Sequence, residues 1–523
     1  MNRFLILIVI QFCFFVAKSQ QSNSTFSRST NIFSEVDLHK IGLDFHTNIK
    51  PFLLSNLDSN IKREEGSWLY RKWNKEHFLH VEKEDYSLIV NPILNVEIGK
   101  EIGSDKTIWT NTRGIIADGK LGEKFTYFSS FLENQSVFPT YITSNILRQS
   151  AWVVPGQGES RWSEDSVFDY TMASGHFTYK MSKFTNVQFG TGKNFIGDGY
   201  RSMILSDNAF NYPYLKLQTT VGIFQYTNLY MEHMDLTSNP SEEFAYDKKY
   251  MSLHYLSANI TDRLNVGIFE SIIWENTRTP EFSGFDIAYL NPIIFLRPIE
   301  FSLNSSDNAL MGLNYKFKIS NSSHFYGQFV IDELSLPELR SNNNWWGKKY
   351  SYQIGGKYFE AFGVDNLVLQ IENNFARPYT YSHFNVSQNY GHYFQSLAHP
   401  LGGNFNELLF FTDYKYKKWE IHLQAITAIF GGKIKGDPTS YGNNIFMSNW
   451  DRPSDYGIDM YQGNRSDLKY FKVIVSYLFN PKTNLKIEGG YVYRMLDDDY
   501  GVYKTNFIFF ALKSDLFNRY YDF

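Results

Sequence analysis

Aromatic rings beside amides, carboxylates and arginine gather in two long segments of the chain, Arg377–Asn404 and Gly431–Ser466. This combination suits carbohydrate, because rings cover the apolar faces of sugars while fixed polar groups bond the hydroxyls. The candidate polysaccharide contacts are Tyr379, His383, Tyr441, Trp450 and Arg452. The pattern predicts a sugar-binding surface. The alternative is that the same residues join the two segments into a lid.

A second set of polar residues lies in Lys193–Asn208 and shortly after Leu290–Pro292. Its members are Lys193, Asp198, Arg201, Asp207, Asn208, Arg297 and Glu300. Gly197 and Gly199 permit a tight, irregular backbone path. We predict that Lys193–Asn208 folds inward and pairs with the Arg297–Glu300 region through charge-assisted hydrogen bonds. An exposed loop is the alternative.

The familiar catalytic and metal-binding patterns are missing from the sequence. Gly190–Gly192 lacks the third glycine of the dinucleotide fingerprint, and no phosphate-binding loop of the P-loop type is present. His77 and His80 are not part of a zinc-protease motif, so they indicate solvated histidines rather than a metal site. Asp497–Asp499 indicates a solvated turn, with a hard cation as the alternative. We therefore expect no catalytic residue, no metal and no cofactor.

The elements that position these residues are predicted strands, and the lengths of the connections between them alternate between short and long. Period-2 patterns from Leu88 onward give about eighteen candidate strands. In Leu367–Phe375, apolar residues alternate with Gln370, Glu372 and Asn374. Tight turns such as Lys417–Lys418 alternate with long connections, and the long ones all fall on one side of the count. This predicts an all-β fold, a closed antiparallel transmembrane β-barrel with long extracellular loops and a short periplasmic N-terminal segment.

The long connections that support this reading are 133–164, 193–212, 275–308, 377–404 and 431–466. Because the expected strand number is even, we expect both termini to face the periplasm. A soluble antiparallel sheet could show the same alternation of side chains, but it gives no reason for every long loop to lie at one end.

Composition agrees with a barrel in the outer membrane. Aromatic residues make up 18% of the chain while the mean hydropathy is only -0.35, as expected when strands show lipid with every second residue. No stretch after the N-terminus reaches the ~18 consecutive apolar residues of a transmembrane helix. The formal net charge of -4 gives no support for nucleic-acid binding. Membrane lipid is therefore the first expected partner.

The N-terminus predicts export. Residues 1–19 combine a basic start, an apolar run and small residues before Gln20, which is typical of a signal peptide. Cys13 is the only cysteine and lies inside that run, so the mature chain has none. We expect a periplasmic N-terminal segment over 20–87, with short helices or a plug, and the barrel over 88–523.

Some segments resemble a known family. Gly190–Ala209, and above all Ser202–Ala209, looks like the signature of the Wzi-type capsule-assembly barrels. Leu290–Pro292, Arg297–Glu300 and Asp307–Asn314 also look like that family. The Trp-Gly-Pro core of the signature is replaced by Phe195–Asp198 in this chain. The resemblance implies an eighteen-stranded barrel that helps to hold or organise surface polysaccharide.

The chain is also similar to a Bacteroidetes branch, the gliding-motility RemB-like proteins. The segments that carry this similarity are Trp68–Arg71, Arg377–His383, Leu397–Gly402 and Asn518–Phe523. The branch implies a part in gliding over surfaces, with proteins of the gliding machinery as partners.

Two functions from different classes stay open at this point. The first is a non-enzymatic outer-membrane barrel that holds surface polysaccharide or supports gliding motility. The second is a diffusion channel or transporter, and ionic conductance in planar bilayers distinguishes the two. An outer-membrane phospholipase is a weaker third choice, because no active-site set stands out.

Overall fold

The computed structural model describes residues 21–23, 26–55, 65–163, 166–237, 246–276, 285–293, 296, 298, 306–333, 337–338 and 343–523. The predicted signal peptide lies outside the described residues, as do Arg297 and Glu300. In the described part of the chain, no helix is both long and apolar enough to cross a membrane.

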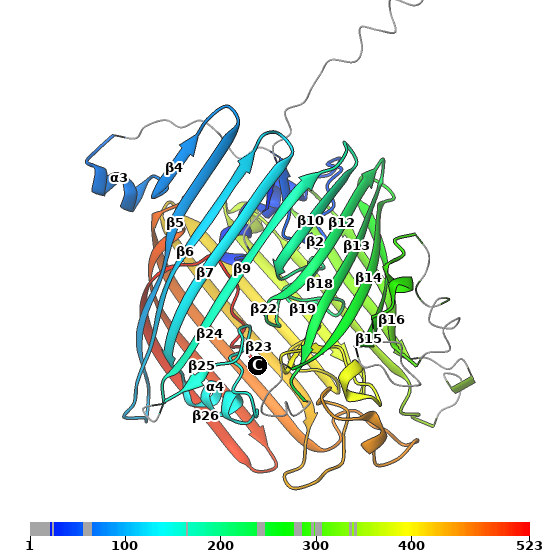
Figure 1. Cartoon of the computed structure of the whole chain (residues 1–523). Helices are drawn as coiled ribbons and strands as arrows, with labels where there is room; N and C mark the ends of the chain where they lie inside the picture. Colours follow the sequence, from blue (N-terminus) through cyan, green and yellow to red (C-terminus); the bar gives the residue numbers. More distant parts are fainter. Residues whose placement is uncertain are drawn as a thin grey trace, which may run out of the picture.

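Eighteen antiparallel strands among the described residues close into one barrel (Figure 1). They are β5 (Tyr86–Glu101), β6 (Thr107–Leu121), β7 (Phe125–Val137), β9 (Phe168–Lys180), β10 (Thr185–Gly192), β12 (Tyr212–Val221), β13 (Phe224–Asp235), β14 (Asp247–Asn259), β15 (Leu264–Glu275), β16 (Asn308–Lys318), β17 (Ser323–Glu333), β18 (Lys349–Tyr358), β19 (Leu367–Ala376), β22 (Phe405–Tyr416), β23 (Trp419–Gly432), β24 (Asn464–Asn480), β25 (Leu485–Asp498) and β26 (Gly501–Ser514). The last strand closes on the first, because Phe507–Lys513 pairs with Asn95–Glu101. The predicted fold class and strand number are confirmed.

The alternation along each strand separates a lipid-facing wall from a polar interior. On β19, Gln370, Glu372 and Asn374 are at most 1% exposed and point into the lumen, whereas Ile371 between them is 53% exposed. Phe510 of β26 is likewise 65% exposed on the outer wall. Apolar side chains outside and polar side chains inside are the arrangement that a bilayer requires of a closed barrel.

The long connections all lie at the same end of the barrel, which also carries the short turns 102–106 and 499–500 (Figure 1). Tight turns at 181–184, 222–223, 260–263, 319–322, 417–418 and 481–484 occupy the opposite end. The long connections are 138–167, 193–211, 276–307, 377–404 and 433–463, and α4 (Thr140–Leu147) lies at their end. In outer-membrane barrels the short turns are periplasmic, so the long connections form the extracellular mouth.

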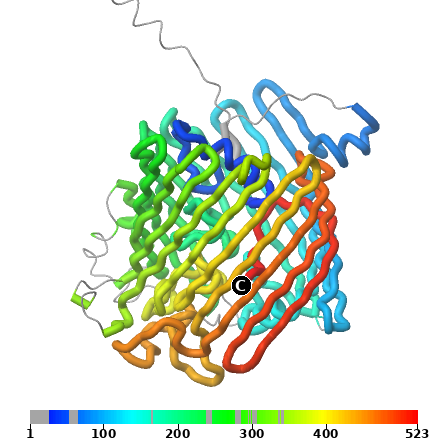
Figure 2. The backbone as a smooth tube through the Cα atoms, turned by 180° about the vertical axis from the view of Figure 1, so that it is seen from behind, coloured from blue at the N-terminus to red at the C-terminus, as the bar shows by residue number. Residues whose placement is uncertain are grey.

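Segments from both ends of the chain and from the long connections fill the lumen. Residues 26–52 enter at the tight-turn end with α1 (Arg28–Asn31), α2 (Glu35–Leu38) and β2 (Ile49–Lys50), and β2 pairs there with β11 (Phe195–Ile196) (Figure 2). The largest buried apolar cluster joins these segments; it includes Ile49, Met203, Leu205, Tyr381 and Leu397. The main core therefore lies inside the barrel.

The C-terminus differs from the expectation that both termini face the periplasm. Strand β26 ends at the tight-turn end, but residues 515–523 then turn back into the lumen, where the C-terminus lies part-way down (Figures 1 and 2). Asp522 is only 1% exposed there. The strand count correctly gives the end at which the last strand finishes, but it carries no information about a tail that finds polar partners inside.

Residues 65–85 precede the barrel on its outer rim. They form α3 (Trp68–Asn74) and β4 (Leu79–Glu82), and β4 pairs with Ser87–Val90 of the first barrel strand. The first strand begins at Tyr86, two residues before the predicted Leu88.

Candidate functional site

A buried arginine from the 193–211 connection is the centre of the lumenal network. The Arg201 guanidinium lies 3.1 Å from Glu407 Oε1 and 3.1 Å from Asp522 Oδ1, and each of the three side chains is at most 2% exposed. It also packs over the rings of Tyr200 and Tyr520, with 4.9 and 5.6 Å to the centroids. One cation thus joins an extracellular connection, a barrel strand and the C-terminal tail.

Two carboxylates on the inner wall hold this connection in place. Glu372 accepts hydrogen bonds from the backbone N–H groups of Tyr200 at 2.8 Å and Arg201 at 3.1 Å, and from the Tyr326 hydroxyl at 2.8 Å. Glu407 lies 2.7 Å from His399 Nε2. Charge-assisted hydrogen bonds of this kind are the strong ones in a dry interior. The network therefore fixes the connection rather than leaving it free to swing.

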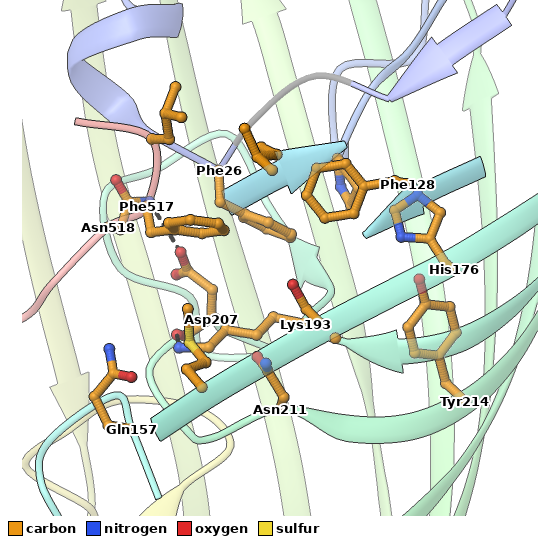
Figure 3. A pocket seen from close by; sticks show the side chains of 16 residues that line it. Phe26, Phe128, Gln157, His176, Lys193, Asp207, Asn211, Tyr214, Phe517 and Asn518 are labelled. Carbon is orange, nitrogen blue, oxygen red and sulfur yellow. Dashed lines mark hydrogen bonds between the residues drawn. The ribbon is translucent and has the colours of Figure 1, made fainter. Parts of the chain in front are cut away.

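Lys193 and Asp207 line a small cavity under the C-terminal tail (Figure 3). The Lys193 ammonium donates to the carbonyls of Gly156 at 2.8 Å and Asp207 at 3.0 Å. The Asp207 carboxylate accepts from the Tyr520 hydroxyl at 2.7 Å and from Asn518 Nδ2 at 2.9 Å. The cavity holds about 50 Å³, which suits a few water molecules rather than a sugar.

The N-terminal segment completes the lumenal network around Asp198. Thr47 Oγ1 donates to Asp198 Oδ1 at 2.5 Å, and the Lys316 ammonium of β16 lies 3.6 Å from the same oxygen. Asn208 Nδ2 donates to the Ser396 carbonyl at 3.2 Å. Lys193, Asp198, Arg201, Asp207 and Asn208 are thus all directed into the lumen. Their described partners lie on the strands, the N-terminal segment, the tail and the connections 138–167 and 377–404. The predicted partners Arg297 and Glu300 lie outside the described residues.

Two connections at the mouth are joined into one lid. Asn404 donates through Nδ2 to the carbonyls of Gly431, Tyr441 and Gln462 at 3.0–3.2 Å. Tyr379 is fully buried and its hydroxyl donates to the Ser440 carbonyl at 2.8 Å. Connections 377–404 and 433–463 therefore support each other, and Tyr379 supports the lid from beneath.

The lid presents an aromatic and charged shelf to the outside, formed by Trp346, Phe384, Trp450, Arg452 and Asp455. Trp450 is 67% exposed and stacks on Phe384, with 4.7 Å between ring centroids and 19° between planes. The Arg452 guanidinium lies 4.1 Å from the centroid of Trp346 and 2.5 Å from Asp455. One ring face is open, beside a cation and a carboxylate whose positions are fixed.

The two remaining candidates, His383 and Tyr441, make different contacts at the mouth. His383 is largely buried and packs on Phe384 at 4.3 Å, and burial lowers its pKa to about 3, so the ring is neutral. The Tyr441 hydroxyl donates to Asp437 at 2.8 Å. Hydrogen bonds from the Thr439 side chain and backbone lead the effects that lower the pKa of Asp437. These pairs hold side chains in place at the mouth.

Sequence reasoning missed several residues that complete these sites. Phe384 and Trp346 are part of the shelf, and neither stands at a spacing that singles it out. Glu372 lies on the predicted polar face of its strand, so the alternation indicated its direction but not its partner. Asp522 lies eight residues beyond the last strand, where no strand pattern applies.

Within the described ranges, no group of three or more His, Cys, Asp or Glu side chains is arranged to hold a metal ion.

Comparison with known proteins gives matches among solved structures only. No family model matches the chain, and no curated protein matches it. A similar solved structure is Wzi of Escherichia coli, described as an outer-membrane protein involved in group 1 capsule assembly and as a carbohydrate-binding β-barrel. The TM-score is 0.51 at 14% identity, over 83% of this chain and 85% of that chain.

Two further solved structures have lower scores. OprD of Pseudomonas aeruginosa has a TM-score of 0.43 at 10% identity, over 84% of this chain and 97% of that chain. OccAB2 of Acinetobacter baumannii has a TM-score of 0.42 at 10% identity, over 83% and 99%.

This chain has the fold of an outer-membrane barrel. Together with the apolar outer wall, that fold places it in the cell outer membrane. The likeness to Wzi agrees at the level of fold with the resemblance seen in Ser202–Ala209. The similarity to the RemB-like branch stays a prediction.

Proposed function

We propose that this barrel binds an extended surface polysaccharide at its extracellular lid and holds it without turnover. The observation that carries the proposal is the shelf in which Trp450 leaves one ring face open beside Arg452 and Asp455. An open ring face packs on the apolar face of a sugar, and the fixed charged pair bonds hydroxyls or a uronate carboxylate. The description of Wzi as a carbohydrate-binding barrel supports the same direction.

The contents of the lumen favour holding over conduction. Arg201, Glu407 and Asp522 form a buried cluster that ties the 193–211 connection to the wall and to the tail. Opening a wide passage requires this cluster to separate, which leaves buried charges uncompensated. A diffusion channel is the competing function, and single-channel conductance of the parent protein in planar bilayers tests it directly.

Weak sites suffice for this function. Each lid needs to hold only a few sugar units, because many copies on one cell engage the same polymer and gain avidity. A role in gliding is a further step of the same proposal. A barrel that holds surface polymer attaches the cell to that polymer, and proteins of the gliding machinery are the partners that this role requires.

The test removes the shelf and leaves the barrel intact. The triple variant Tyr441→Ala, Trp450→Ala, Arg452→Ala is compared with the parent for binding to polysaccharide extracted from the producing cells. At ~0.5–1.5 kcal/mol for an aromatic packing contact, the loss of Trp450 alone predicts a roughly two- to tenfold weaker apparent affinity per site, and the triple variant more.

The matched control is Trp162→Ala. Trp162 lies in the 138–167 connection, is 40% exposed and is outside the shelf. It should bind polysaccharide like the parent. Capsule retention and spreading on agar are scored in the same strains. If the triple variant matches the parent in all three measurements, the lid is structural and the sugar-binding proposal fails.

A further inference from the structure

The segment before the first barrel strand carries a dense apolar surface that the barrel does not cover. Helix α3 begins after Ser67, whose hydroxyl caps it by accepting from the Tyr70 N–H at 3.3 Å. The helix and the strand after it expose six large apolar side chains, each 43–59% accessible: Trp68, Leu69, Tyr70, Trp73, Phe78 and Leu79. This is a concentrated patch on a stretch of twelve residues, and such patches mark interaction surfaces.

This segment is fixed to the rim of the barrel at two points. Asn480, the last residue of β24, donates through Nδ2 to the carbonyls of Lys72 and Glu76, both at 2.9 Å. Asn91 of β5 accepts from the Phe78 N–H at 2.9 Å and lies 3.0 Å from His77 Nδ1. The two anchors lie on strands three places apart around the wall, so α3 is held across the ends of the strands between them.

The polar side chains of the helix have their partners within the same segment. Arg71 and Lys72 both pair with Glu76, at 2.9 and 3.0 Å, and all three side chains are at most 20% exposed. The remaining cation, Lys75, lies over the ring of Tyr70 at 5.9 Å. The outward side therefore presents rings and leucines with Lys75 beside them, and the helix itself contains no acidic residue.

The position of the patch relative to the barrel wall indicates what covers it. Figures 1 and 2 show α3 outside the barrel wall, at the level where the strands end on the tight-turn side. On the outer wall next to Asn480, Trp419, Tyr477 and Phe479 form a row with ring centroids 5.1 and 5.3 Å apart. Trp and Tyr gather where a barrel meets the lipid headgroups. The α3 patch thus continues the aromatic girdle outward at the same height.

We propose that α3 and β4 form an interfacial foot that lies in the periplasmic leaflet of the outer membrane. Its six apolar side chains enter the boundary between headgroups and acyl chains, and Lys75 lies at the level of the lipid phosphates, as basic residues do in membrane-surface amphipathic helices. The foot widens the footprint of the barrel on one side and fixes its height and tilt relative to the bilayer. The occupant of the patch is lipid, not a periplasmic protein.

Spin labelling tests this directly, because Cys13 is the only cysteine in the sequence. In a Cys13→Ser background, Leu69→Cys carries a nitroxide label in the full protein reconstituted in vesicles of phosphatidylethanolamine and phosphatidylglycerol. Collision rates are measured with oxygen, which concentrates in the bilayer, and with a water-soluble nickel complex. Heat-modifiable migration on gels shows that each variant is folded.

Two matched positions calibrate the measurement. Phe510→Cys lies on the lipid-facing wall, and Lys83→Cys lies in the exposed turn between β4 and β5. The label at position 69 should show a several-fold higher ratio of oxygen to nickel collisions than the label at 83. The label at 510 should also show a higher ratio than the label at 83. Trp73→Cys, on the same patch, serves if Leu69→Cys does not fold.

Two results overturn the proposal. A label at 69 that meets nickel as often as the label at 83 lies in water. A label shielded from both reagents is covered by protein, which assigns the patch to a second copy of the chain.

Discussion

Arg201→Met isolates the contribution of the buried charge cluster. Methionine keeps an unbranched stem between the rings of Tyr200 and Tyr520 but removes the guanidinium that lies 3.1 Å from both Glu407 and Asp522. Two carboxylates, each at most 2% exposed, then lose their shared cation. Breaking a buried ion pair by removing one partner costs ~3–5 kcal/mol.

The structure indicates where this cost appears. The ladder of eighteen strands does not depend on Arg201, whereas the tail 515–523 lies outside the ladder and is held through side-chain contacts. At Asp522 these come from Arg201, Tyr200 and Gln424. Release of the tail is the cheapest way for Asp522 to regain water. A loss of ~3–5 kcal/mol raises the population of the released tail by roughly 100- to 4,000-fold, at about 1.4 kcal/mol for each factor of ten.

Carboxypeptidase digestion of the folded protein, followed by mass spectrometry, measures that population. When opening is fast relative to cleavage, the digestion rate follows the fraction of released tail. Arg465→Met is the matched control, because Arg465 pairs with Asp467 at 3.5 Å while both side chains are about half exposed. Such exposed pairs are worth ~0–1 kcal/mol, and they do not touch the tail.

A second variant separates charge from packing. Adding Glu407→Gln and Asp522→Asn to Arg201→Met removes the uncompensated charges, and most of the protection should return, since replacing all partners of a buried ion pair is far less costly than removing one. If Arg201→Met is digested at the rate of the parent while its barrel remains heat-modifiable, the buried cluster does not hold the tail and the reasoning is refuted.

Two further predictions concern the N-terminal segment and the topology. Burial lowers the pKa of His46 to about 4, and its Nδ1 lies 2.7 Å from the Ser257 hydroxyl. The docked residue therefore holds its proton more weakly than a released one with a pKa near 6.5, so docking of residues 26–52 should weaken as the pH falls from about 6.5 through 4. Proteolysis of this segment measures the effect, His46→Gln should reduce it, and an equal pH response in parent and variant contradicts the assignment. An epitope at Gly436, in the 433–463 connection, should label intact cells, whereas one at Gly222, in the 222–223 turn, should label only permeabilised cells; the reverse result inverts the topology.

The lid shows how far loop composition can be interpreted. The concentration of aromatic and amide residues in Arg377–Asn404 and Gly431–Ser466 predicted a sugar-binding surface, with a lid as the alternative, and Asn404 does join the two segments. Composition could not show which of these aromatic residues are exposed to solvent. Tyr379 is fully buried, whereas Trp450 is 67% exposed. Exposure depends on the path of the backbone, and the sequence of an irregular loop has no period from which that path follows.

The sequence by itself determined the barrel. A strand in a bilayer wall faces lipid on one side and the lumen on the other, so the choice of apolar or polar residue is made locally at every second position, as between Ile371 and Glu372. The long connections are also visible in the sequence, and they all fall on one side of the strand count, which defined the mouth end. Only the tertiary structure decided what fills the lumen. Arg201 lies 206 residues from Glu407 and 321 from Asp522 along the chain, and these groups meet because barrel closure confines the tail, the N-terminal segment and the 193–211 connection in one dry space, where each buried charge must find a partner.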